Sequence, residues 1–116
     1  MAALHGVGGS IVLVAEVLFV IGSALMSRRG GSPWVGRAVI VVAALLAAEA
    51  VLGAITWLGG DRPREALHYL YAVAALATLP LAATFASEAP PRPRAMVMAV
   101  AGVLLVILTW RLASTG

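Results

Sequence analysis

The stretch RPREALHYLY, residues 62–71, opens the third long apolar segment of the chain. It contains charged residues, one of the two histidines and both tyrosines, whereas the sequence around it is mostly Ala, Val, Leu and Gly. Polar groups are costly inside such segments, so they are the residues that inform about fold and function. The counterpart of His68 in this stretch is His5, at the start of the first apolar segment.

The composition indicates an integral membrane protein. Of 116 residues, 62% are hydrophobic and only 11% are charged, and the mean hydropathy is +1.02. A soluble domain of this size needs more polar surface. The absence of cysteine excludes disulfides, iron–sulfur clusters and thiolate zinc sites. The basic residues are all arginines in or beside short loops, so membrane topology explains them better than nucleic-acid binding does.

Four apolar segments are long enough to cross a hydrocarbon core of roughly 30 Å as helices. Only helices satisfy the backbone in lipid, and no strand-like alternation competes with this interpretation. The sequence therefore predicts an all-α fold, a single transmembrane four-helix bundle over residues 1–116. The short loops, rich in Gly, Pro, Ser and Arg, favour up-down-up-down order. The predicted helices cover residues 4–26, 34–58, 64–86 and 95–112.

The arginine distribution predicts the orientation of the bundle. The first and third loops and the start of the second segment carry one set: Arg28, Arg29, Arg37, Arg92 and Arg94. The opposite side carries a smaller set, diluted by acidic residues: Arg62, Arg64 and Arg111. The positive-inside rule then places the first and third loops in the cytoplasm and both termini outside. The Ala-rich, Lys-free composition is typical of GC-rich bacteria, so we expect a multi-pass protein of the bacterial inner (plasma) membrane.

His5 and His68 open segments that run in the same direction, so we expect them at the same depth near the outer face. In a square bundle with neighbouring helices about 10 Å apart, the first and third helices are separated by a diagonal of roughly 14 Å, room for a flat macrocycle. Two imidazoles are an axial ligand set for haem iron, and without a C-x-x-C-H motif the haem would be b-type and non-covalent. Arg62, Arg64 and Arg111 are the expected partners of its propionates. The alternative is that both histidines are interfacial residues without a ligand.

Glu16 and Glu49 are predicted near the middle of the bilayer. An ionised carboxylate facing lipid costs at least ~2.5 kcal/mol, so both are expected protonated and facing the bundle or a partner subunit. A functional interpretation is a proton path or a hydrogen bond to a quinone. A structural interpretation is a hydrogen bond to a hydroxyl of another helix, with three candidates: Ser23, Thr56 and Thr78.

Three short stretches carry a resemblance: LHYLY at residues 67–71, Leu79-Pro80-Leu81, and the ending with Arg111 and Thr115-Gly116. They resemble a group of small four-helix bacterial membrane proteins. The arrangement is similar to that of membrane b-type cytochromes and of one half of haem A synthase, in which paired histidines on parallel helices hold haem. The resemblance implies ligand roles for His5 and His68.

A second resemblance involves Ala15-Glu16-Val17. Together with the chain length and the four helices, it looks like a small multidrug resistance transporter, whose first-helix Glu exchanges protons for cationic drugs. The aromatic residues of that family's cation site are not evident, because the first three segments contain aromatics mainly at their ends, apart from Phe19 and Phe85. A cavity poor in aromatics binds a lipophilic cation poorly.

No segment remains for a soluble catalytic domain, so we expect the chain to pass electrons rather than to act as a stand-alone enzyme. The favoured function is a membrane b-type haem protein, a small subunit of a respiratory or photosynthetic complex. Its expected partners are membrane lipid and the other membrane subunits, not nucleic acid. Two alternatives remain open: a cofactor-free accessory subunit of a larger complex, and a proton-coupled small multidrug exporter.

Overall fold

The computed structural model describes residues 2–116 and contains four helices in that range, without strands. Their bounds are α1 (Ala2–Arg28), α2 (Trp34–Leu58), α3 (Leu67–Phe85) and α4 (Pro91–Thr115). The predicted all-α fold with four helices is confirmed. Each helix is long and apolar enough to cross a membrane, which indicates a multi-pass membrane protein.

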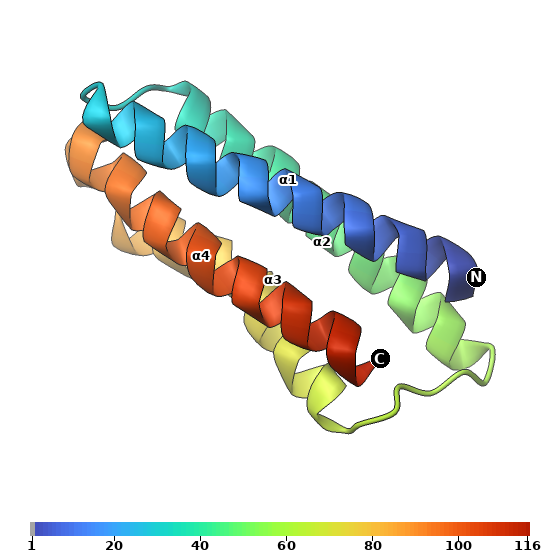
Figure 1. Ribbon diagram of the computed structural model, residues 1–116. Coiled ribbons are helices and arrows are strands. Elements are labelled where there is room, and N and C mark those ends of the chain that lie inside the picture. The colour runs from blue at the N-terminus through green and yellow to red at the C-terminus, as the bar shows by residue number, and fades with distance from the viewer. Residues whose placement is uncertain (1) are drawn as a thin grey trace.

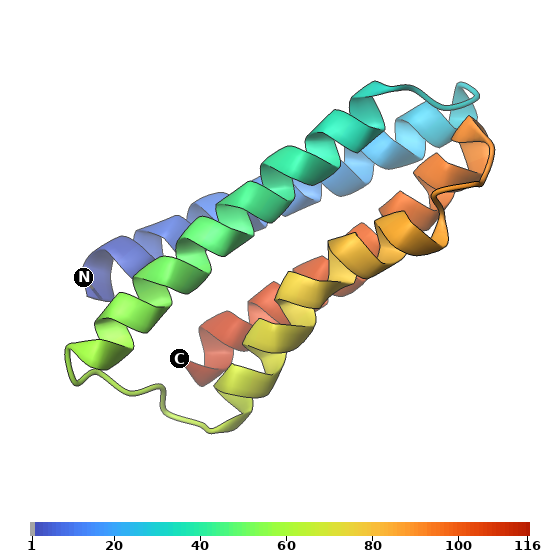
Figure 2. The same ribbon diagram turned by 180° about the vertical axis from the view of Figure 1, so that it is seen from behind.

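The helices form a slender bundle with extents of 48 × 21 × 19 Å. α1 packs against α2 and α4, and α3 packs against α4 and less extensively against α2, so α1 and α3 occupy opposite corners (Figure 1). Both chain ends and the α2–α3 connection lie at one end of the bundle, here called the terminal end (Figure 1). The α1–α2 and α3–α4 connections lie at the other end, here called the loop end (Figure 2).

Two helix starts differ from the predicted ones by three or more residues, those of α3 and α4. α3 begins at Leu67 rather than near residue 64, and the segment before it is held against the end of α4, where the Glu65 N–H donates to the Thr115 carbonyl at 3.1 Å. α4 begins at Pro91 rather than near residue 95, because proline is tolerated in a first helical turn. His68 is therefore in the first turn of α3.

The α1–α2 loop rests on the start of α4. Gly30 and Gly31 have φ values of +91° and +95°, which L side chains rarely adopt. A Cβ on Gly31 would lie 2.5 Å from the carbonyl carbon of Pro91, whereas a Cβ on Gly30 would meet nothing within 4 Å. Glycine at position 31 is thus required by both its backbone angle and its contact with α4.

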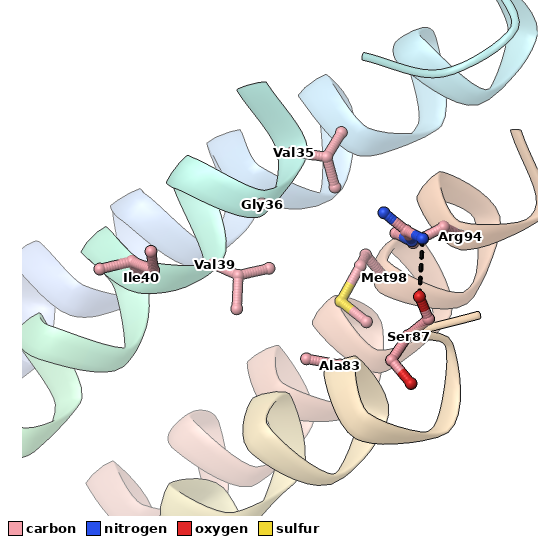
Figure 3. A pocket seen from close by; sticks show the side chains of 8 residues that line it. All are labelled: Val35, Gly36, Val39, Ile40, Ala83, Ser87, Arg94 and Met98. Carbon is pink, nitrogen blue, oxygen red and sulfur yellow. Dashed lines mark hydrogen bonds between the residues drawn. The ribbon is translucent and has the colours of Figure 1, made fainter. Parts of the chain in front are cut away.

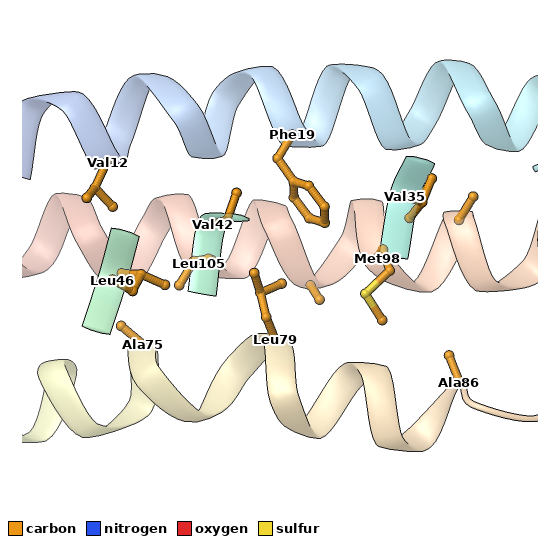
Figure 4. Packing of buried hydrophobic residues seen from close by; sticks show 12 residues of the cluster. Val12, Phe19, Val35, Val42, Leu46, Ala75, Leu79, Ala86, Met98 and Leu105 are labelled. Atoms are coloured by element: carbon orange, nitrogen blue, oxygen red, sulfur yellow. The ribbon is translucent and has the colours of Figure 1, made fainter. Parts of the chain in front are cut away.

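The apolar core runs along the bundle axis (Figure 4). Its members nearest the terminal end are Val12 on α1, Leu46 on α2, Ala75 on α3 and Leu105 on α4. Beyond these positions, the buried side chains of the described residues are the polar Thr56, Thr109 and Thr115. The remaining core members fill the bundle toward the loop end: Phe19, Val35, Val42, Leu79, Ala86, Ala95, Met98 and Ala101. The terminal end, where the histidines lie, is therefore built from polar rather than apolar buried groups.

Candidate functional site

His5 of α1 faces Glu49 of α2. The His5 Nδ1 and Glu49 Oε2 atoms lie 2.9 Å apart, and the two side chains are 33% and 13% exposed. Both atoms are shielded from solvent, but their approach is not aligned as a hydrogen bond. The contact is therefore a close polar pairing that a small rotation of the carboxyl group would convert into a hydrogen bond.

Two glycines make room for this pair. A Cβ on Gly8 of α1 would overlap the Glu49 carboxyl group, and a Cβ on Gly53 of α2 would lie 3.2 Å from His5 Cε1. Any larger residue at position 8 must push the Glu49 carboxyl group away, and one at position 53 must displace the His5 ring. The glycine at position 53 is a site residue that the sequence interpretation missed; its spacing of one helical turn from Glu49 is the signal that points to it.

His68 of α3 is held by the last turn of α4. Its Nδ1 lies 3.1 Å from the Leu112 carbonyl oxygen and 3.3 Å from Thr115 Oγ1. A carbonyl oxygen only accepts, so Nδ1 carries a proton, and the Thr115 hydroxyl can also accept because it donates its own proton to the Arg111 carbonyl at 2.9 Å. In neutral His68 the Nε2 atom then keeps its lone pair. A Cβ on Gly116 would lie 2.9 Å from His68 Cε1, so the chain end fits against the ring.

The two histidines share the terminal end but do not contact the same helix. His5 packs on α2 and His68 packs on α4, while α1 and α3 stand at opposite corners of the bundle. No hydrogen bond joins the two imidazoles in the part of the chain that the structure describes. Each imidazole has its Nδ1 beside an oxygen acceptor, which is the environment usual for histidines that bind a metal through Nε2.

The arginines predicted to meet propionates lie on exposed positions at the terminal end. The Arg62 guanidinium lies over the Trp57 ring, 4.4 Å from its centroid. The Arg111 guanidinium lies 5.5 Å from the centroid of Tyr71 and donates to its hydroxyl at 3.5 Å. Arg64 is exposed. Two of the three guanidinium groups are thus positioned by aromatic rings.

Glu16 lies in the α1–α4 interface and is fully buried. Its Oε1 accepts a hydrogen bond of 2.7 Å from Thr109 Oγ1, while its Oε2 is buried without a partner. The predicted type of bond, to a hydroxyl of another helix, is present for Glu16, but the predicted hydroxyls of Ser23, Thr56 and Thr78 are wrong because none of them bonds to Glu16 or Glu49. Thr56 and Thr78 donate to carbonyls of their own helices at 2.8 and 2.7 Å.

Thr109, the partner of Glu16 that the sequence interpretation missed, could have been noticed in the sequence. It is the one hydroxyl residue inside the apolar run of residues 95–110. Which face of which helix it meets depends on the pairing of α1 with α4, and the sequence alone does not give that pairing.

The hydrogen bond between Thr109 and Glu16 is expected to stabilise the folded protein. Thr109→Val keeps the side-chain shape but leaves a buried carboxyl oxygen without its donor, so we expect the free energy of unfolding to fall by about 1–2 kcal/mol. Unfolding in mixed detergent micelles titrated with dodecyl sulfate measures this. The matched control is Thr78→Val, because the Thr78 hydroxyl bonds only within its own helix. Equal losses in the two variants would show that the Glu16 contact adds nothing.

The residues at the terminal end fit a haem by the chemistry of their donors. Both imidazoles have Nδ1 beside an acceptor, and the apolar core begins only at Val12 and Ala75, about two helical turns beyond His5 and His68. Among the described residues no three His, Cys, Asp or Glu side chains converge. No protein-family model, curated protein or solved structure matches the chain.

Proposed function

We propose that this chain is a membrane electron-transfer protein whose His5 and His68 hold a b-type haem near the outer face. The bundle would cross the bacterial inner membrane in up-down-up-down order with both termini outside. The observation that carries the proposal is the pairing of His68 Nδ1 with the Leu112 carbonyl, which leaves Nε2 as a lone-pair donor. A haem bound there would supply a reversible one-electron carrier.

The residues of the chain have separate roles in this proposal. Leu112 and Thr115 fix the tautomer and the orientation of His68. Glu49 lies beside His5 Nδ1 and would do the same for His5 after a small rotation of its carboxyl group. The surface arginines at the terminal end supply positive charge for propionates. They are Arg62, Arg64 and Arg111. Partner subunits of a respiratory or photosynthetic complex would provide the electron donor and acceptor, one of which is proposed to be a quinone.

An absorption spectrum tests the proposal. Protein purified from haem-replete cells in mild detergent should show the Soret and split visible bands of a six-coordinate low-spin haem b. Acid acetone should extract the haem, because the chain has no cysteine to bind it covalently. A colourless preparation with intact helices by circular dichroism would refute the proposal.

The second candidate is a cofactor-free accessory subunit of a larger membrane complex. It is favoured by the use of Glu16 and Thr109 as a contact between helices within a closed core. The proton-coupled exporter is the least supported of the three, because in this conformation the Glu16 carboxyl is sealed from any cationic substrate.

The proposed orientation makes its own prediction. The chain has no native cysteine, so single-cysteine variants give labelling without background. Asp61→Cys, in the α2–α3 connection, should react with a membrane-impermeant maleimide added to spheroplasts. Ser32→Cys, in the α1–α2 loop, should react only after the membrane is permeabilised. The reverse pattern would place the histidines on the cytoplasmic side.

A further inference from the structure

A cleft near the loop end is not used by the proposed haem site. It has a volume of about 360 Å³, within the range of roughly 300–1,000 Å³ usual for small-molecule sites. It lies between α2 on one side and the α3–α4 pair on the other (Figure 3). Its lining residues are Val35, Gly36, Val39, Ile40, Ala83, Ser87, Arg94 and Met98.

The wall of the cleft that α2 forms is apolar, and it has a gap where Gly36 lacks a side chain. Val35, Val39 and Ile40 provide branched aliphatic side chains, and Gly36 provides none. A Cβ on Gly36 would meet no atom within 4 Å. The space beside Gly36 is thus available to an apolar chain that enters from the bilayer.

Arg94 stands at the polar side of the cleft in a fixed position. Its Nε donates to the Ala86 carbonyl at 3.2 Å, and its Nη2 donates to the Ala89 carbonyl at 2.9 Å. Nη2 also donates to the Ser87 carbonyl at 2.8 Å (Figure 3). These bonds use three of the five guanidinium N–H groups. The two N–H groups of Nη1 remain for an oxyanion, and the guanidinium is already ordered before it binds one.

The charge of the loop end favours an anion. Around the single acidic Glu88, the two loops and the adjoining helix ends carry five arginines: Arg28, Arg29, Arg37, Arg92 and Arg94. A neutral quinone would leave the Arg94 cation without a counter-charge, and a water-soluble anion would leave the aliphatic walls uncovered. An occupant that uses both features has an apolar chain and an anionic head.

We propose that this cleft binds an anionic phospholipid, with one acyl chain against Gly36 and Val39 and the phosphate on Nη1 of Arg94. The proposal needs only that the helices lie in a bilayer. It is independent of whether a haem binds at the terminal end.

Native mass spectrometry of the full chain tests it. Protein released from nanodiscs that contain equal amounts of phosphatidylglycerol and phosphatidylcholine should retain one phosphatidylglycerol in preference to phosphatidylcholine. Gly36→Leu adds a side chain to the wall of the cleft at a position where a Cβ meets no atom within 4 Å, and it should reduce the retained lipid about tenfold through overpacking of the bound chain. Gly22→Leu is the matched control, because a Cβ at Gly22 also meets nothing within 4 Å but Gly22 is on α1, away from the cleft.

A second variant tests the headgroup contact. Arg94→Gln should reduce the preference for phosphatidylglycerol about tenfold by removing a charge-assisted hydrogen bond. Circular dichroism and size-exclusion chromatography check that each variant is folded, and glycerol phosphate without acyl chains should fail to compete. Equal retention of the two lipids by the wild type would overturn the proposal, as would a Gly36→Leu variant that binds like Gly22→Leu. An unchanged preference in Arg94→Gln would overturn the assignment of the phosphate to Arg94.

Discussion

His68→Ala is expected to abolish the haem spectrum of the purified protein. His68 is the better-positioned ligand, because the Leu112 carbonyl of α4 fixes its tautomer and Gly116, just after α4, lies beside its ring. His5→Ala should leave at most a weak five-coordinate, high-spin form, because one axial imidazole remains. Absorption spectra of both variants, normalised to protein, measure the two outcomes.

Adding free imidazole to a His68 variant distinguishes the loss of a haem ligand from a loss of folding. In His68→Gly, imidazole added to the buffer should restore a low-spin spectrum if the lost group was an axial ligand. If both histidine variants keep the wild-type spectrum, His5 and His68 are not the ligands. The positioning role of Thr115 is checked by Thr115→Val, which should retain the haem but shift its reduction potential, since the Leu112 carbonyl still accepts from His68 Nδ1.

Gly31→Ala is expected to be the most destabilising change in the loops. The left-handed backbone angle costs an L residue about 1–2 kcal/mol, and the contact of the new Cβ with the Pro91 backbone adds about 1–3 kcal/mol. The total loss in the free energy of unfolding should be about 2–5 kcal/mol. The Pro91 backbone is held in the first turn of α4, so the loop itself must move.

Gly30→Ala is the matched control for this prediction. Gly30 has nearly the same φ, but its Cβ would point into open space, so it should lose only the backbone contribution of about 1–2 kcal/mol. Unfolding in dodecyl sulfate titrations compares the two variants. Equal losses would mean that the α1–α2 loop does not rest on α4 in the membrane.

The four helices are predictable from the sequence because each apolar segment is a local property of its own residues. α2 starts and ends at the predicted residues, 34 and 58. The start of α3 is not predictable in this way, because it depends on the hydrogen bond between Glu65 and Thr115 of α4. Helix ends are fixed partly by contacts with remote segments, and such contacts carry no local pattern.

For the candidate site, the sequence predicts the direction in which each helix runs and the depth of each histidine, but not the neighbours of each polar group. Two parallel segments that open with histidines bring His5 and His68 to the same end of the bundle. The neighbours of each polar group depend on how each helix is rotated about its own axis. The pairing of Glu49 with His5 and of Glu16 with Thr109 follows from that rotation, and an all-apolar helix surface gives no signal for it.

The polar contacts of α1 bear on how the protein assembles after its helices are inserted. His5 meets α2, Glu16 meets α4, and Ser27 donates to the Arg92 carbonyl at 3.4 Å near the loop end. In lipid, apolar side chains are solvated equally well on every side, so they do not fix which face of a helix meets its neighbours. A helix turned by one residue would face its carboxyl group toward lipid, at a cost of about 2.5–3.5 kcal/mol if ionised. The few polar side chains of α1 therefore destabilise bundles in which α1 is rotated incorrectly about its own axis. Correct assembly depends on these side chains more than on the apolar core.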